Sequence, residues 1–187
     1  MLEAFGRYKY SLLYFVSIVL TNALYAKLGA QLMWATPFGD GTTTWSPLAI
    51  IVGFWFILRD FAQEELGRKV LAVMAAGMVA SYAMAGGVVA TASAIAFAAG
   101  ELTDFAVYTY MRHKPFARRM LVSSLASAPI DTFLFFAVAD MLHMVPGVQT
   151  LSWPTVLTET VSKLAAAAFV FYRINKRTMT VGDHCVA

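Results

Sequence analysis

The sequence predicts an all-α membrane protein in which six transmembrane helices form a single domain. Of its 187 residues, 59% are hydrophobic and only 13% are charged, whereas an ordinary soluble domain has about 45 to 50% apolar and about 25% charged residues. A transmembrane helix needs about 20 apolar residues, so six of them leave only short loops. A separate water-soluble domain is excluded, and residues 1–187 are expected to form one transmembrane domain.

The expected spans follow from the apolar runs and the turn residues between them. Residues 70–110 would measure about 60 Å as one helix, against a hydrocarbon core of about 30 Å. This run must therefore be two helices, and the pair Gly86-Gly87 favours a turn between them. Trp153-Pro154 is typical of a helix start at the membrane interface. The six spans are expected at residues 10–28, 43–60, 67–85, 88–110, 116–142 and 154–172.

Two of these spans have unusual features. The second span follows a stretch of turn residues, 33–47, which is expected to be an ordered loop, and it stops at Arg59-Asp60. It is short unless Arg59 snorkels toward the interface. The fifth span contains Pro129, which removes a backbone donor and is expected to kink the helix.

The basic residues predict the orientation in the membrane. Six spans place both termini on one side, and all 14 Lys and Arg residues except Lys27 and Lys163 fall on that side. Cytoplasmic loops collect Lys and Arg, so we expect both termini in the cytoplasm and the chain in the cell (inner) membrane. The net charge of +3 is then a consequence of topology, not a sign of nucleic-acid binding. A cleaved signal peptide is the alternative for the first span, but Tyr25 interrupts the cleavage pattern and further spans follow.

Several chemistries are excluded by what the sequence contains. A single cysteine, Cys185, and three scattered histidines cannot build a multi-cysteine metal site or an intrachain disulfide. Metalloprotease, nucleophile-elbow and phosphate-binding loop motifs are absent from the sequence, so an ATPase on this chain is excluded. We expect neither an enzyme nor a bound cofactor.

Ionisable and polar side chains nevertheless fall inside the expected spans. An isolated charge at mid-helix costs about 2.5 to 3.5 kcal/mol, so such residues usually face the bundle interior and mark a substrate or ion path. Glu101 and Asp104 share a helix face, and Asp131 follows Pro129 in the broken fifth span. They are expected to line a polar pocket. The complete set is Asn22, Glu101, Asp104, Asp131, Glu159 and Lys163.

Structural interpretations remain open for part of this set. Glu159 and Lys163 are four residues apart and can form an ion pair within one helix. Asn22 can equally hydrogen-bond one helix to another. Asp60 and Glu64 are expected to form a structural cluster with the basic residues at the cytoplasmic end of the second span.

Four short patterns occur in order along these spans. They are Asp60-x-x-x-Glu64-x-x-Gly67 with a basic pair, Gly100-Glu101-x-x-Asp104 running to Tyr108, Ser127-x-x-x-Asp131-Thr132-x-x-Phe135-Phe136, and Glu159-x-x-x-Lys163. Together, from Asn22 to Arg177, they resemble the queuosine-precursor transporters of the vitamin-uptake-transporter type. The chain departs from that pattern at Glu101, where the family usually has glutamine, at Pro129, and in the short Gly86-Gly87 connection.

The resemblance implies uptake of a 7-deazaguanine, meaning the cyano or aminomethyl precursor of the tRNA nucleoside queuosine or the free base queuine. It also implies a fold similar to the substrate-binding subunits of energy-coupling-factor transporters, with a pocket open to the outside. The implied partners are a small-molecule substrate and the lipid membrane. A homo-oligomer and an ATPase energising module are compatible with the resemblance but not required by any residue.

A deazaguanine suits a pocket lined by carboxylates. Its ring N–H and exocyclic amine can donate to one carboxylate, and charge-assisted bonds are about twice as strong as neutral ones. Glu101, Asp104 and Asp131 are the expected acceptors, while Lys163 or Asn22 can donate to the ring carbonyl. The aromatic residues that could stack on the ring are Trp45, Tyr108 and Phe133.

Two other functions fit the same residues. The acidic groups of a proton-coupled carrier or channel component for another small solute would relay protons. In a structural or assembly membrane protein the charges would only pair helix to helix.

Overall fold

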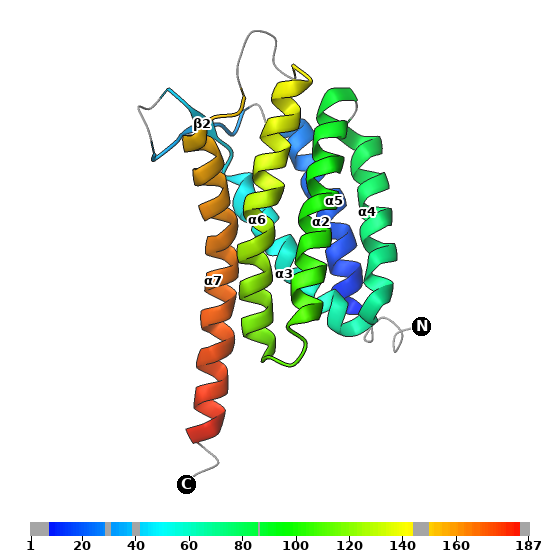
Figure 1. The fold of residues 1–187 in the computed structure, drawn as a ribbon, viewed down its shortest axis with the longest axis vertical. Coiled ribbons are helices and arrows are strands. Elements are labelled where there is room, and N and C mark those ends of the chain that lie inside the picture. Colours follow the sequence, from blue (N-terminus) through cyan, green and yellow to red (C-terminus); the bar gives the residue numbers. More distant parts are fainter. Residues whose placement is uncertain (1–7, 29–30, 39–41, 86, 144–149, 184–187) are drawn as a thin grey trace.

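The computed structural model describes residues 8–28, 31–38, 42–85, 87–143 and 150–183, and they form the predicted all-α bundle (Figure 1). The helices are α2 (Lys9–Leu28), α3 (Leu48–Leu66), the 3-10 turn η1 (Gly67–Lys69), α4 (Val70–Ala85), α5 (Gly87–Tyr110), α6 (Phe116–Met141) and α7 (Trp153–Asp183). A small antiparallel hairpin, β1 (Trp34–Ala35) with β2 (Thr44–Trp45), lies between α2 and α3.

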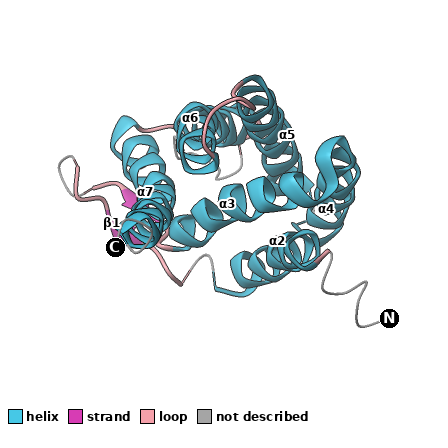
Figure 2. Ribbon diagram, turned by 90° about the horizontal axis from the view of Figure 1, so that it is seen from below, coloured by secondary structure: helices cyan, strands magenta, loops and turns pink. Residues whose placement is uncertain are grey.

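Helix α3 lies in the middle of the bundle, as the view along the helices in Figure 2 shows. It packs mainly against α2 and α7 and also contacts α4, α5 and α6. The other main contacts join α5 to α6, α6 to α7, α2 to α4 and α4 to α5. A polar side chain on α3 therefore meets partners from several helices at once.

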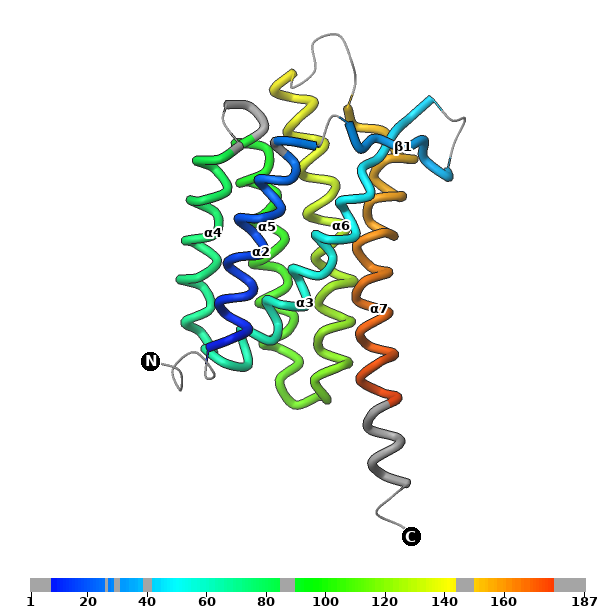
Figure 3. Tube along the Cα trace, turned by 180° about the vertical axis from the view of Figure 1, so that it is seen from behind, coloured from blue at the N-terminus to red at the C-terminus, as the bar shows by residue number. Residues whose placement is uncertain are grey.

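The two ends of the bundle differ in composition. The start of α2, the turn η1, the α5–α6 turn and the end of α7 share one end, and the hairpin lies at the other (Figures 1 and 3). We call these the basic end and the hairpin end. The basic residues that define the basic end are Lys9, Arg68, Lys69, Arg112 and Lys114.

Helix α3 differs most from its prediction, which placed a span at residues 43–60. It begins at Leu48 because Thr44 and Trp45 pair with the preceding strand, in the register Trp34↔Trp45 and Ala35↔Thr44. It continues to Leu66, and Gly67 then takes a positive φ of 56°, the conformation in which helices commonly end. The prediction that the helix stops at residue 60 was wrong. It took Arg59 and Asp60 for the polar end of a span, whereas both side chains are buried inside the bundle.

The other helices lie close to the predicted ranges. Helix α6 begins directly after Pro115 and continues through Pro129. Helix α7 extends to Asp183, beyond the expected end at residue 172. The predicted turn at Gly86-Gly87 falls partly outside the described residues, since Gly86 is not among them, but α4 ends just before it.

The surface of the bundle is unusually apolar and its interior unusually polar. Two stretches, Leu48–Met84 and Phe116–Met141, are long and apolar enough to cross a membrane. Large hydrophobic side chains are exposed along every helix, whereas soluble monomers rarely expose large contiguous apolar patches. They include Leu13, Leu20, Phe54, Val79, Tyr82, Ile95, Leu102, Leu125, Val161 and Phe169. The buried charged residues are Arg59, Asp60, Glu101, Asp104 and Lys163.

One glycine sets the closest approach of α3 to α7. A Cβ at Gly53 would collide with the backbone carbonyl oxygen and Cα of Lys163. A Cβ at Gly77, in α4, would meet only the side chain of Ile18, and the one close atom, Cδ1 at 2.7 Å, is the end of that side chain. The two positions thus differ in whether the obstacle can move.

Replacing Gly53 by alanine is expected to destabilise the protein by about 1–3 kcal/mol, the usual effect of overpacking. Gly77→Ala is the matched control and is expected to change stability by less than about 1 kcal/mol, because Ile18 can rotate and alanine favours helix. Thermal unfolding of both variants in detergent measures the difference. Equal melting temperatures would show that α3 and α7 are not held at this distance.

Candidate functional site

The first polar site is an ion pair between α6 and α7. Lys163 Nζ lies 2.6 Å from Asp131 Oδ2 and donates a second hydrogen bond, of 2.8 Å, to Thr132 Oγ1. The lysine is only 6% exposed. It is therefore bound to the neighbouring helix, and the ion pair with Glu159 within α7, one of the two interpretations left open by the sequence, is not the one observed.

Glu159 instead connects α7 to the segment that follows the hairpin. Its Oε1 accepts a hydrogen bond of 3.4 Å from the backbone N–H of Ser46, and Thr155 Oγ1 donates to the carbonyl of Thr44 at 3.0 Å. Tyr25 of α2 interacts with the Ser46 side chain and lies within electrostatic range of Glu159. The hairpin is thus fastened to α7 one turn from Lys163. We call Asp131, Thr132, Glu159 and Lys163 the Lys163 site.

The second polar site surrounds Arg59, whose side chain is 0% exposed. Its Nε lies 3.2 Å from Glu101 Oε2 and its Nη2 lies 2.7 Å from Asp104 Oδ2, both on α5. Its Nη1 donates to Asp60 Oδ1 at 2.9 Å and to Gln63 Oε1 at 2.6 Å, both on α3. The expectation that Arg59 snorkels to the interface is wrong, because three carboxylates hold it inside the bundle. We call these five residues the Arg59 cluster.

A third group of charges lies between the Arg59 cluster and the basic end. The Tyr108 hydroxyl donates to Glu64 Oε1 at 2.7 Å, and Arg119 Nη2 lies 2.9 Å from the same oxygen. The Arg119 guanidinium carbon also sits 4.5 Å from the centre of the Tyr108 ring. The sequence led us to expect Asp60 and Glu64 together at this helix end, but only Glu64 lies here, and its cation is Arg119 of α6. Tyr108, a candidate for stacking on a ligand, is held by Glu64 and Arg119.

The remaining predicted residues are dispersed. Asn22 accepts a hydrogen bond of 2.9 Å from Ser81 Oγ, which joins α2 to α4. Trp45 packs edge-on against Trp34 in the hairpin, with ring centres 6.2 Å apart. Phe133 is 40% exposed and stacks on Trp153. Phe133 follows Thr132 of the Lys163 site, and Trp45 lies between Thr44 and Ser46, both of which contact α7.

The two buried sites are neighbours. Gly100 of α5 approaches α6 so closely that a Cβ there would lie 2.8 Å from the Cβ of Asp131. The next residue, Glu101, is bound to Arg59 and also interacts electrostatically with Asp131. The three predicted acceptors, Glu101, Asp104 and Asp131, therefore lie in adjacent places but are held by two different cations.

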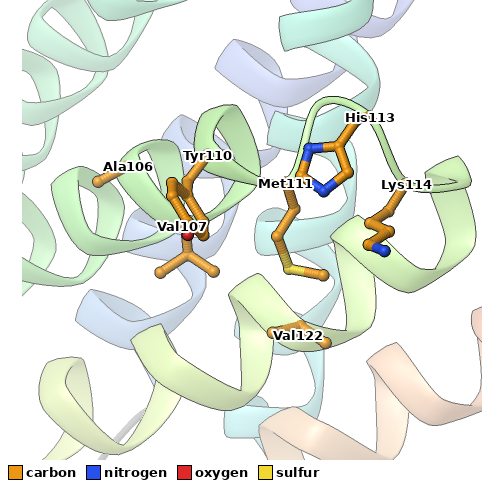
Figure 4. Close-up of a pocket in the computed structure, with 7 residues that line it drawn as sticks. All are labelled: Ala106, Val107, Tyr110, Met111, His113, Lys114 and Val122. Atoms are coloured by element: carbon orange, nitrogen blue, oxygen red, sulfur yellow. The ribbon is translucent and has the colours of Figure 1, made fainter.

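A cavity lies elsewhere, at the α5–α6 turn (Figure 4). It has a volume of about 700 Å³ and an almost entirely apolar wall. A second groove of about 390 Å³ lies between α2 and α4. Neither contains a predicted site residue. The first is lined by Ala106, Val107, Tyr110, Met111, His113, Lys114 and Val122.

Sequence reasoning missed Arg59, Gln63 and Thr132 as members of the buried sites. Arg59 was assigned to a helix end because Asp60 follows it and an apolar run precedes it. The signal that could have placed it inside is Gly67, a residue type that often follows the last turn of a helix. A helix that runs on to that glycine puts Arg59 two turns before its end, and Gln63 one turn further along the same face.

Comparison with known protein families gives one match. Residues 48–174 match the family described as "Putative vitamin uptake transporter". The matched region is about two thirds of the chain and contains both the Lys163 site and the Arg59 cluster. No curated protein and no solved structure matches the chain.

Replacing Arg59 by glutamine is expected to destabilise the protein by about 3–5 kcal/mol, because it leaves buried carboxylates without their cation. Arg118→Gln is the control, since Arg118 is exposed on the neighbouring α6, and it is expected to change stability by no more than about 0.5 kcal/mol. Unfolding of both variants in detergent measures the difference. An Arg59 variant as stable as the control would contradict the central role of this ion-pair network.

Proposed function

We propose, from the premise that the chain belongs to the family described as "Putative vitamin uptake transporter", that it imports a 7-deazaguanine precursor of queuosine through the Lys163 site. The family assigns the coarser function, uptake of a small solute across a membrane. The order of motifs from Asp60 to Lys163 supports the narrower substrate. The apolar surface of the bundle supports six membrane spans, with the basic end in the cytoplasm and the hairpin end outside.

The observation that carries this proposal is the set of groups gathered between α6 and α7. The site contains one buried ammonium, that of Lys163, and two carboxylates. Asp131 of α6 lies 2.6 Å from the ammonium, and Glu159 lies one turn before Lys163 on α7. A guanine-like ring presents a carbonyl acceptor beside ring N–H and amine donors. Lys163 would donate to the carbonyl, and a carboxylate would accept from the N–H and the amine.

The ion pair also explains how the buried charges of the site are stabilised when no ligand is bound. Asp131 and Lys163 compensate each other's charge at 2.6 Å, so neither is left buried and unpaired, which would be strongly destabilising. A ligand that offers both donors and an acceptor can replace each half of the pair. Glu101 and Asp104 are not ligand acceptors in this proposal, because both carboxylates are already ion-paired with Arg59.

The hairpin completes the proposed site on the outer side. The Ser46 amide binds Glu159, and the Thr44 carbonyl binds Thr155. A substrate that displaced the Ser46 contact would loosen the hairpin, so entry from outside requires only local movement of this segment. Trp45, which precedes Ser46, is the aromatic residue best placed to stack on a flat heterocycle.

Asp131→Asn is expected to weaken binding of the cyano 7-deazaguanine about tenfold to a hundredfold, because it removes a charge-assisted hydrogen bond worth about 1.5–3 kcal/mol. Equilibrium binding to the purified protein measures the change, and thermal unfolding checks that the variant is folded. Asp140→Asn is the matched control, since Asp140 binds Thr150 at the hairpin end. Normal affinity in the Asp131 variant would remove Asp131 from the site. A wild-type protein that binds no deazaguanine would favour a purely structural role for these charges.

Glu159→Gln is expected to lower affinity more for the aminomethyl precursor than for the cyano precursor. The aminomethyl group carries a positive charge that a second carboxylate would compensate, whereas the nitrile is uncharged and needs no such partner. Competition binding with the two compounds measures the ratio in the variant and in the wild type. An unchanged ratio would show that Glu159 does not face this substituent.

A further inference from the structure

The Arg59 cluster contains more acid than base. Arg59 contributes one positive charge, while Asp60, Glu101 and Asp104 contribute three negative charges when all are ionised, and all four side chains are at most 2% exposed. In surroundings of low polarity a carboxylate without a cation takes up a proton, because the neutral form is cheaper to bury. The cluster is electrically neutral when two of its three carboxyl groups are protonated.

The charged side chains around the cluster do not supply the missing positive charge, because they form pairs of their own. Arg119 is bound to Glu64, and Lys163 is bound to Asp131. The titratable and charged groups that face the cluster are Tyr14 on α2, Glu64 on α3, Tyr108 on α5, Arg119 and Asp131 on α6, and Lys163, through Asp131, on α7.

The carboxylates of the cluster have fewer hydrogen-bond donors than their oxygens can accept. Asp60 Oδ2 is buried without a hydrogen-bond partner among the described residues. Asp104 Oδ2 faces Arg59, and beside that ion pair Asp104 interacts with the Ser123 hydroxyl. Tyr14, on a different helix and 0% exposed, places its hydroxyl beside Glu101. Buried polar atoms are normally satisfied, so a carboxylate oxygen such as Asp60 Oδ2 is where an additional proton would bind.

We propose that the Arg59 cluster is a proton-binding site, and that the protein carries a proton inward together with its substrate. This inference rests on the transport function proposed above. In the cycle, one carboxylate oxygen takes a proton when the site faces outward and releases it when the site faces inward. Only an O–H bond forms and breaks.

A proton fits this cluster better than a metal ion. The described residues include no group of three acidic, histidine or cysteine side chains arranged to hold a metal. The Arg59 guanidinium also occupies the centre, with its nitrogens 2.7 to 3.2 Å from one oxygen of each of the three carboxylates. A second cation placed there would be repelled by it, whereas a proton binds to a carboxylate oxygen that points away.

The position of Glu101 explains how a proton and a substrate would influence each other. Glu101 follows Gly100, which lies against Asp131 of the Lys163 site. Neutralising Glu101 removes a negative charge beside Asp131 and so changes the field in which a ligand binds. Coupling of this kind is reciprocal, so substrate bound at Asp131 changes the proton affinity of the cluster by the same factor.

Tyr108 and Glu64 lie between the cluster and the basic end. The Tyr108 ring lies 5.9 Å from the Arg59 guanidinium carbon, and its hydroxyl donates to Glu64. The Glu64 side chain is 46% exposed. The proposal therefore places the release of the proton on this side of the cluster, where a carboxylate reaches the surface.

The test uses the full chain in phospholipid vesicles with the membrane potential clamped at zero and the neutral cyano 7-deazaguanine as probe. With the inside one pH unit more alkaline, wild-type protein is expected to accumulate the probe up to about tenfold, the limit for one proton per substrate. Asp104→Asn and Glu101→Gln are expected to lose this accumulation while retaining exchange of labelled for unlabelled probe. Asp140→Asn is the control and is expected to retain both.

Three results would overturn the proposal. They are accumulation by wild type without a pH gradient, accumulation driven by sodium instead, and proton-driven accumulation that persists in both cluster variants. A measurement without substrate separates this inference from the proposed function. The infrared spectrum of the purified protein should contain the band of a protonated carboxyl group, and Asp104→Asn should weaken it. Absence of that band overturns the proton site, whereas failure of the probe to bind with the band present overturns only the substrate.

Discussion

The guanidinium of Arg59 is the interaction on which the arrangement of the bundle depends. It lies on the central helix and binds two carboxylates of α5, at 3.2 and 2.7 Å, as well as two side chains of its own helix. Between lipid-facing helices there is little hydrophobic driving force for association, so packing and interhelical polar contacts carry more of it. A fork-shaped cation with five donors can bind several carboxylates at once, and this geometry fixes both the rotation of α3 and its depth beside α5.

The sequence was sufficient for the parts of the fold that follow from local rules. Apolar runs, the length of a membrane span and the turn residues Gly86-Gly87 and Trp153-Pro154 predict most helices close to those observed. The sequence was insufficient where tertiary contacts determine the end of a helix or the burial of a side chain. The second span was expected to begin at residue 43, but Thr44 and Trp45 pair with the strand Trp34–Ala35 and the helix begins only at Leu48. The burial of Arg59 depends on acids 42 to 45 positions away in the chain.

The same distinction applies to the functional residues. Glu101, Asp104 and Lys163 were found from the sequence, since an ionisable residue inside an apolar span is conspicuous, whereas Arg59 and Asp60 were placed at a helix end. The partners were not, because spacing along one helix reveals only neighbours on that helix. Lys163 has Glu159 one turn away, yet its ammonium group lies against Asp131 of α6. Side-chain direction and helix packing decide between such partners, and neither can be derived from periodicity alone.

The glycines of the two neighbouring helices show why the Lys163 site is where helices can influence one another. Lys163 lies against Gly53 of α3, and Asp131 lies against Gly100 of α5. Each member of the ion pair therefore lies beside a glycine of a neighbouring helix, so α3 packs closely on α7 and α5 closely on α6 at this level of the bundle. A ligand bound between Asp131 and Lys163 would therefore lie against α3 and α5, the two helices that Arg59 joins. In the proposed cycle, substrate bound at the Lys163 site and a proton bound at the Arg59 cluster would act on the same helix contacts, which is the physical condition for coupling one to the other.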